Sequence, residues 1–122
     1  MDRHKRQRHQ RSGRQAEAMA ALWLRLKGYT ILARNFRHGS GEVDLLARRG
    51  QVLAAVEVKW RPDHDQAAAA VSPRQKYRIQ RAASVFWAQL PDHDRVALRF
   101  DALLLAPWRL PHHIRDAWRP EL

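Results

Sequence analysis

The chain has 122 residues, a length typical of one domain with a single hydrophobic core. Its formal net charge of +11 at pH 7 indicates a polyanionic partner, with nucleic acid the first candidate; a basic protein that is merely soluble is the alternative. The absence of cysteine excludes a disulfide framework and agrees with a cytoplasmic location. Neither an apolar run of about 20 residues nor a secretory signal is present, so no membrane segment is expected.

Residues 1–11 are dominated by basic and polar side chains and are predicted to form a disordered basic tail. A single domain is expected over residues 12–122. Ser12 followed by Gln15 has the spacing of a capping box, which predicts that the first helix begins there. This helix should run to about Lys27, because the glycine that follows favours a helix end.

Three strands are predicted after this helix, at Tyr29–Phe36, Glu42–Ala47 and Val52–Trp60. A turn over Arg48–Gln51 would make the second and third strands an antiparallel pair. The third strand is almost entirely apolar, as expected of a strand that is covered on both faces. A loop is predicted over Pro62–Gln66.

A second helix is predicted to begin with Ser72 as its cap, Pro73 at the first helical position and Gln75 three residues after the cap. A fourth strand is predicted over Arg95–Leu105, and no element is predicted from Pro107 onward. The order α-β-β-β-α-β predicts an α/β fold in which helices pack against a central sheet.

Two acids and a lysine on neighbouring strands carry the strongest chemical signal. Glu57 and Lys59 share one face of their strand, whereas Val56 and Val58 face the other way. Asp44 lies on the preceding strand and should converge with them at one end of the sheet. Converging carboxylates bind hard divalent cations such as Mg²⁺, and a lysine beside them orients water or stabilises developing charge. The alternatives are a solvated Asp44 and a Glu57 that simply pairs with Lys59.

This arrangement resembles the D…(D/E)xK signature of restriction-endonuclease-like, or PD-(D/E)xK, nucleases. The chain is more closely similar to the bacterial YraN or UPF0102 family, whose members look like archaeal Holliday-junction resolvases. The resemblance extends from about Gly13 to Trp118 and implies a restriction-endonuclease-like core with a mixed central sheet flanked by helices. Trp60 departs from the family pattern, which usually has a small residue or threonine there. The matching segments are Glu17, Gly28-Tyr29, Arg34-Asn35, Gly41-Glu42-Val43-Asp44, Val56-Glu57-Val58-Lys59-Trp60-Arg61, Val71-Ser72-Pro73 and Arg99-Phe100-Asp101.

The resemblance also implies a set of roles. Asp44 and Glu57 would bind Mg²⁺ or Mn²⁺, with the carbonyl of Val58 as an extra ligand, and Lys59 would act on the attacking water. Glu17 would be a further acid that reaches the metal through water; an exposed early-helix glutamate is the alternative. A homodimer is expected by analogy with the resolvases.

Basic side chains are predicted to surround the acids. Arg74, Arg78 and Arg81 recur at helical spacing and form either a phosphate-binding strip or a solvated charged face. Gln75 is explained by the capping box, with a substrate contact as the alternative. The predicted nucleic-acid-binding residues are Arg34, Arg37, Arg61, Arg74, Gln75, Lys76, Arg78 and Arg81.

Most of the tryptophans are predicted to be core residues from their spacing, namely Trp23 and Trp87 on helices and Trp60 on the third strand. Trp108 and Trp118 are less constrained and could stack on nucleic-acid bases.

Two functions agree with these patterns. The first is a metal-dependent nuclease that hydrolyses DNA phosphodiesters, in branched or structured DNA. The alternative is a non-catalytic nucleic-acid-binding protein that keeps the nuclease fold. Two carboxylates facing phosphate favour the nuclease, because they repel the nucleic-acid backbone unless a cation intervenes.

Overall fold

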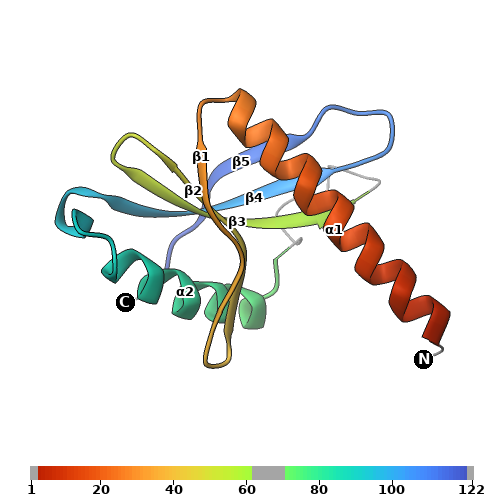
Figure 1. Ribbon diagram of the computed structural model, residues 1–122, viewed down its shortest axis with the longest axis horizontal. Coiled ribbons are helices and arrows are strands. Elements are labelled where there is room, and N and C mark those ends of the chain that lie inside the picture. The colour runs from red at the N-terminus through yellow and green to blue at the C-terminus, as the bar shows by residue number, and fades with distance from the viewer. Residues whose placement is uncertain (1–2, 62–70, 121–122) are drawn as a thin grey trace.

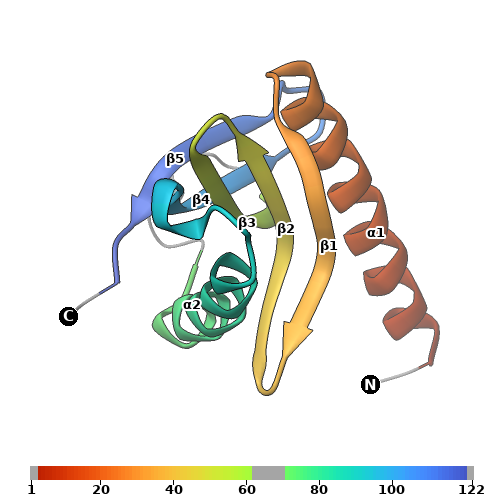
Figure 2. The ribbon, with the colours of Figure 1, turned by 60° about the vertical axis from the view of Figure 1, so that its left-hand side comes forward.

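The computed structural model describes residues 3–61 and 71–120, and within residues 3–12 only the helical backbone. The loop predicted at Pro62–Gln66 lies outside these ranges. The elements form a five-stranded sheet with a helix on each face (Figures 1 and 2). They are α1 (Arg3–Leu26), β1 (Thr30–His38), β2 (Gly41–Arg49), β3 (Val52–Trp60), α2 (Pro73–Ala88), the short 3₁₀ helix η2 (His93–Arg95), β4 (Ala97–Leu105) and β5 (His112–Trp118).

The predicted α/β fold is confirmed, and β3 has the predicted bounds. The prediction of one strand after α2 is wrong, because β5 follows β4 and pairs with it antiparallel. Sequence patterning missed β5 because it is an edge strand with mostly half-buried or exposed residues, His112–Trp118, and so shows little apolar alternation.

Helix α1 begins at Arg3 rather than at Ser12, so the predicted capping box at Ser12 does not start it. Arginine, lysine and glutamine are favourable helix formers, and no glycine or proline precedes Gly13 to interrupt them. The disorder predicted for residues 1–11 and the domain limits 12–122 stay predictions. Neither α1 nor α2, among the described parts of the chain, is long and apolar enough to cross a membrane.

The sheet has the order β1-β2-β3-β4-β5, and β3 and β4 are its only parallel neighbours in the described chain. Their register runs from Val52 opposite Ala97 to Trp60 opposite Leu105, with α2 in the crossover between them. One apolar cluster lies between the sheet and α2, and a second lies between the sheet and α1. Strand β3 contributes to both clusters, which explains its nearly continuous apolar sequence.

Helix α2 begins with the predicted capping box. The Ser72 hydroxyl accepts a hydrogen bond from the Gln75 backbone N–H at 3.1 Å, and the Gln75 side-chain oxygen accepts one from the Ser72 N–H at 3.0 Å. These two bonds fix the first turn of the helix and hold the Gln75 side chain close to it.

Of the three tryptophans predicted to be core residues, two are confirmed and one is not. Trp23 and Trp87 pack against the two apolar clusters as predicted. Trp60 is not a core residue, because 45% of it is exposed. Trp118 is buried and stacks on Phe100 with ring centroids 5.5 Å apart, so its ring is not available to nucleic-acid bases.

Gly41 allows α2 to approach β2 closely. A Cβ atom at this position would lie 2.8 Å from the Ala82 backbone nitrogen and 2.9 Å from the Arg78 carbonyl oxygen. Both contacts are with helix backbone, which does not move aside as a flexible side chain does. The position of α2 over the sheet therefore depends on the missing side chain of Gly41.

We predict that Gly41→Ala lowers the free energy of unfolding by about 1–3 kcal/mol, because the added methyl overpacks the contact with α2. Gly13→Ala is the matched control: nothing lies within 4 Å of a Cβ there, and alanine in a helix should stabilise by roughly 0.5–1 kcal/mol. Urea denaturation of both variants measures the difference. Equal stability of the two variants would contradict the close approach.

Candidate metal-dependent active site

Strand β2 changes the face it presents at Asp44. Val43 packs in the cluster under α2, whereas Leu45 packs in the cluster under α1. Residues two apart in a regular strand share a face, so the strand twists sharply between them. The ladder between β2 and β3 also ends here, with Leu45 opposite Val56 as its last pair. Asp44 is thus the first residue of β2 beyond regular pairing with β3.

Because β2 no longer pairs with β3 at Asp44, the Asp44 carboxylate lies against the β3 backbone. Its Oδ2 accepts a hydrogen bond from the Val58 backbone N–H at 2.9 Å, and its carboxyl group lies close enough to that of Glu57 for each group to act on the pKa of the other. Glu57 Oε1 lies 3.4 Å from Lys59 Nζ, and these two side chains are only 12% and 17% exposed. The structure therefore brings together the two acids and the lysine that the sequence singled out.

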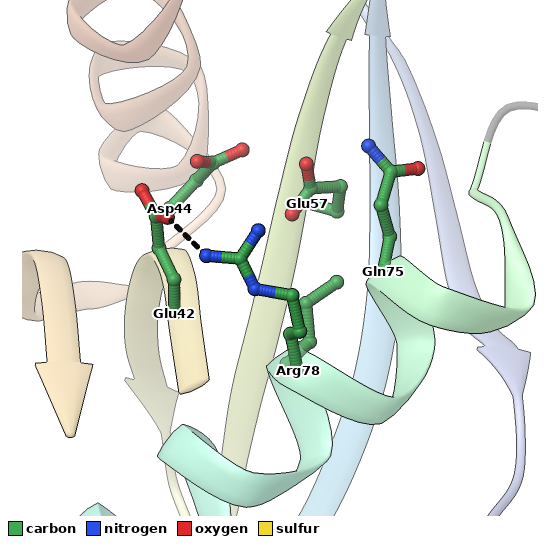
Figure 3. A pocket seen from close by; sticks show the side chains of 6 residues that line it. Glu42, Asp44, Glu57, Gln75 and Arg78 are labelled. Atoms are coloured by element: carbon green, nitrogen blue, oxygen red, sulfur yellow. Dashed lines mark hydrogen bonds and ion pairs between the residues drawn. The ribbon is translucent and has the colours of Figure 1, made fainter. Parts of the chain in front are cut away.

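Two cavities meet at this acid pair. A cavity of about 130 Å³ on the α2 side is lined by Asp44, Glu57, Glu42, Gln75 and Arg78. Figure 3 shows Gln75 and Arg78 extending from α2 toward the three carboxylates. A larger cavity of about 380 Å³ is also bounded by the acid pair, and it is lined further by Glu17, Val58, Lys59, Trp60 and Arg61. The acid pair is therefore accessible from both cavities.

Burial and mutual repulsion keep a proton on the pair. Burial, and then the charge of Asp44, raise the pKa of Glu57 to about 8, although Lys59 opposes this shift. Burial also raises the pKa of Asp44, against the hydrogen bond from Val58. Two carboxylates this close repel each other when both are ionised, so one proton occupies the pair near neutral pH. A divalent cation would provide the compensating charge in its place.

Glu17 reaches the larger cavity from α1. It lies on the same side of the helix as the buried residues Ala21 and Leu24. Its Oε2 accepts a hydrogen bond of 2.7 Å from Asn35 Nδ2. Burial raises the pKa of Glu17, and the charge of Asp44 adds to this rise, while Asn35 opposes it. The charge of Asp44 thus acts on Glu17 at a distance.

Glu42 is a site residue that the sequence reasoning did not assign. It lies two residues before Asp44 on β2 and pairs with Arg37 at 3.3 Å and with Arg78 at 3.2 Å. Arg78 also donates from Nε to the Ser40 carbonyl at 3.0 Å. The spacing of Glu42 and Asp44 on one strand was the signal that could have identified Glu42.

The predicted nucleic-acid-binding residues separate into two groups. The first group lines the cavities at the acid pair and contains Arg61, Arg78 and Gln75. Arg37 lies next to this group, because it pairs with Glu42. Arg34 is exposed on β1, and its charge acts on Glu17.

The remaining basic residues lie on α2 away from the acids. Arg74 is exposed, Lys76 Nζ lies 5.8 Å from the Trp118 ring centre, and the Arg81 guanidinium lies 5.7 Å from that of Tyr77. They line neither cavity at the acid pair, and their role in nucleic-acid binding stays a prediction.

The donor set suits a hard cation that also uses other oxygens. Within residues 13–61 and 71–120, no three histidine, aspartate or glutamate side chains are grouped to hold a metal by themselves. Asp44 and Glu57 supply two carboxylates. Mg²⁺ commonly binds through one or two carboxylates and completes its shell with waters and substrate phosphates, so this pair fits such an ion.

A second buried acid, Asp101 on β4, has the opposite environment. It is fully buried and accepts bonds from Arg99 through both oxygens at 2.8 Å, from His113 Nε2 at 2.8 Å and from the Asp116 N–H at 3.0 Å. Burial alone would raise the pKa of Asp101, but the bonds from His113 and Arg99 outweigh it and lower the pKa. The role of Asp101 is structural, because its bonds with His113 and Asp116 connect β5 to β4.

The sequence matches the model of a protein family described as "Uncharacterised protein family UPF0102" over residues 16–105. The chain belongs to the UPF0102 family. It is 55% identical over 114 residues to a UPF0102 protein of Paramagnetospirillum magneticum, covering 90% of this chain and 88% of the relative. It is 49% identical over 110 residues to one of Parvibaculum lavamentivorans, covering 90% and 83%. The family resemblance predicted from the sequence is thereby confirmed.

We predict that Glu57→Gln stabilises the metal-free protein at high pH. The folded-state pKa of Glu57, about 8, lies above its ordinary value of 4.5, so folding takes up a proton between these values. The wild-type free energy of unfolding therefore falls as pH rises from about 4.5 to 8, whereas glutamine does not titrate. At pH 9 the variant should be more stable by on the order of 2 kcal/mol, and the difference should shrink toward pH 5.

Urea denaturation in EDTA at a series of pH values measures this difference. Asp94→Asn, which changes an exposed carboxylate on η2, is the control. A stability difference between Glu57→Gln and the wild type that does not depend on pH would contradict the raised pKa.

We predict that Asp101→Asn destabilises the protein by about 3–5 kcal/mol, because it removes the charge that compensates partly buried Arg99. Asp92→Asn is the matched control, since it breaks an arginine–aspartate pair with Arg48 at the surface, where solvent screens the interaction. Thermal and urea denaturation compare the two. Similar losses in both variants would mean that burial of the Asp101 network contributes nothing.

Proposed function

We propose that the protein is a metal-dependent nuclease that hydrolyses DNA phosphodiesters, with branched or structured DNA as its substrate. One observation carries this proposal: Asp44 and Glu57 share a partly buried site whose lysine, Lys59, lies 3.4 Å from Glu57. A protein that only bound nucleic acid would gain nothing from two carboxylates that repel phosphate.

Asp44, Glu57 and the backbone of Val58 would hold Mg²⁺ or Mn²⁺. The N–H and C=O groups of one strand residue point to the same side of the strand. The Val58 N–H points at Asp44, so the Val58 carbonyl also faces the part of β2 before Leu45, which no longer pairs with β3. When bound, the cation would polarise the scissile phosphate and lower the pKa of an attacking water.

Lys59 would position the attacking water and stabilise the charge that develops on the phosphate. Its ammonium group pairs with Glu57. With Glu57 engaged as a ligand, Lys59 Nζ is available to donate to a water or to a phosphate oxygen in the larger cavity that it lines. Glu17 borders the same cavity and would hold a metal-bound water.

The nucleic-acid partner is supported by charge. The net charge of +11 attracts a polyanion, and Arg61 and Arg78 lie in the two cavities at the acid pair. Gln75 has its side-chain oxygen committed to the helix cap, so its amide nitrogen is the group that would contact a phosphate or water. The homodimer and the cytoplasmic location stay predictions.

We predict that Asp44→Ala abolishes cleavage while DNA binding is equal or slightly tighter, because a negative charge facing phosphate is removed. The rate should fall by more than roughly 100-fold, since even outer-shell partners of a metal are worth up to that factor. Lys59→Ala should lower the rate by about 100-fold with only slightly weaker binding. Asp94→Ala is the control, because Asp94 is exposed on η2 and lines neither cavity at the acid pair.

Cleavage is measured on labelled duplex and four-way-junction DNA with Mn²⁺, and binding on the same probes in EDTA. Cleavage that survives Asp44→Ala would place the activity at another site or in a contaminant. Tight binding without cleavage by the wild type under any divalent cation would favour the non-catalytic binding protein instead.

A further inference from the structure

Two exposed tryptophans lie at the end of the sheet that carries the candidate active site. Trp60 ends β3 and is 45% exposed, and Trp108, in the connection between β4 and β5, is fully exposed. Trp108 also has a positive φ of 61°, which a bulky residue rarely adopts. Exposed apolar side chains that gather in one place mark interaction sites, so the relative position of the two rings is decisive.

The topology brings these two residues to the same end of the sheet. Trp60 is in register with Leu105 in the parallel β3–β4 pair, and the Arg61 N–H donates to the Leu105 carbonyl at 2.7 Å. Trp108 follows Leu105 by three residues, a stretch that spans at most about 11 Å. Figure 1 shows β3 and β4 ending on the same side of the sheet, with the β4–β5 connection beyond them.

Trp60 also belongs to the site itself. It lines the cavity of about 380 Å³ whose other walls include Asp44, Glu57 and Lys59. One of the two rings therefore lines the cavity where the proposed chemistry takes place, and the other lies on the β4–β5 connection at the same end of the sheet.

The charges beside the two rings identify the partner. Arg61 directly follows Trp60, and exposed Arg109 directly follows Trp108. Indole rings paired with cations bind single-stranded nucleic acid, because each unpaired base offers a face for stacking while its phosphate meets the cation. Bases inside a duplex are already stacked on each other and do not reach an exposed indole. The net charge of +11 favours this polyanion over an apolar protein surface.

We propose that Trp60 and Trp108 form a base-stacking surface that binds an unpaired DNA strand beside the acid pair. This inference rests on the proposed nuclease function and narrows its substrate to DNA with a single-stranded segment next to the scissile phosphate. Arg61 and Arg109 bind the phosphates of that segment, and the stacked bases hold the strand in register with Asp44 and Glu57.

The test measures binding of the full-length protein to three fluorescein-labelled probes in EDTA: a single strand, a blunt duplex, and a fork with one single-stranded arm. Trp108→Ala should weaken binding to the single strand and the fork by about 5- to 100-fold and leave duplex binding unchanged. Trp60→Ala should act in the same direction. Trp108→Phe should retain most of the affinity, because a phenyl ring still stacks.

Leu26→Ala is the matched control, since Leu26 is a large exposed apolar residue at the far end of α1. It should change none of the three affinities. Tryptophan fluorescence provides a second readout: oligothymidylate should quench the emission of the wild type, and Trp108→Ala should lose part of this quenching.

Equal losses on all three probes, or no loss on any of them, would overturn the stacking surface. It would also be overturned if Trp108→Ala abolished binding to anionic phospholipid vesicles while DNA binding stayed intact. Cleavage of the same probes with Mn²⁺ separates this inference from the proposed function. Selective loss of single-strand binding without any wild-type cleavage keeps the surface and rejects the nuclease, whereas wild-type cleavage with unchanged affinities in Trp108→Ala does the reverse.

Discussion

The proximity of two carboxylates, Asp44 and Glu57, is the constraint on which the site depends. Like charges this close and this buried raise each other's pKa, so the metal-free protein keeps a proton between them. Two features of the fold make this proximity possible: β2 stops pairing with β3 at Asp44, and Lys59 lies next to Glu57. Neither device removes the repulsion, because both carboxyl pKa values remain raised. The cation that we propose would supply the positive charge that this pair lacks.

Comparison with Asp101 shows that this cost is not a general property of the fold. Asp101 is more deeply buried than Asp44, yet its pKa is lowered, because Arg99, His113 and a backbone N–H satisfy it. The same chain thus satisfies one buried acid fully and leaves the other pair short of positive charge. A buried acid that the protein satisfies contributes to stability, whereas an unsatisfied pair that lines two cavities indicates a binding function.

Sequence reasoning predicted the parts of this structure that depend on local patterns. The bounds of β3 followed from its apolar run, the start of α2 from the Ser72–Gln75 capping box, and the convergence of Asp44 with Glu57 from alternation and a short turn. It missed β5, whose edge position leaves no apolar alternation, and it placed the start of α1 too late. It also misassigned Trp60, because alternation specifies the face of a strand but not whether a helix covers the end of that face. The pairing of Glu42 with Arg78 of α2 depends on the close approach at Gly41, which only tertiary structure reveals.

For the proposed nuclease, the charge distribution separates the attraction of DNA from the chemistry on it. The molecule carries +11 overall, yet Glu17, Glu42, Asp44 and Glu57 concentrate negative charge around the two cavities. Basic residues on the surface act over roughly a Debye length and gather a polyanion, an effect that salt weakens. The acidic centre repels phosphate at short range, and burial protects this repulsion from screening. On the proposed function, a phosphate enters the site only where a cation lies between it and the carboxylates, so DNA binding would depend on the basic residues and cleavage on the acids.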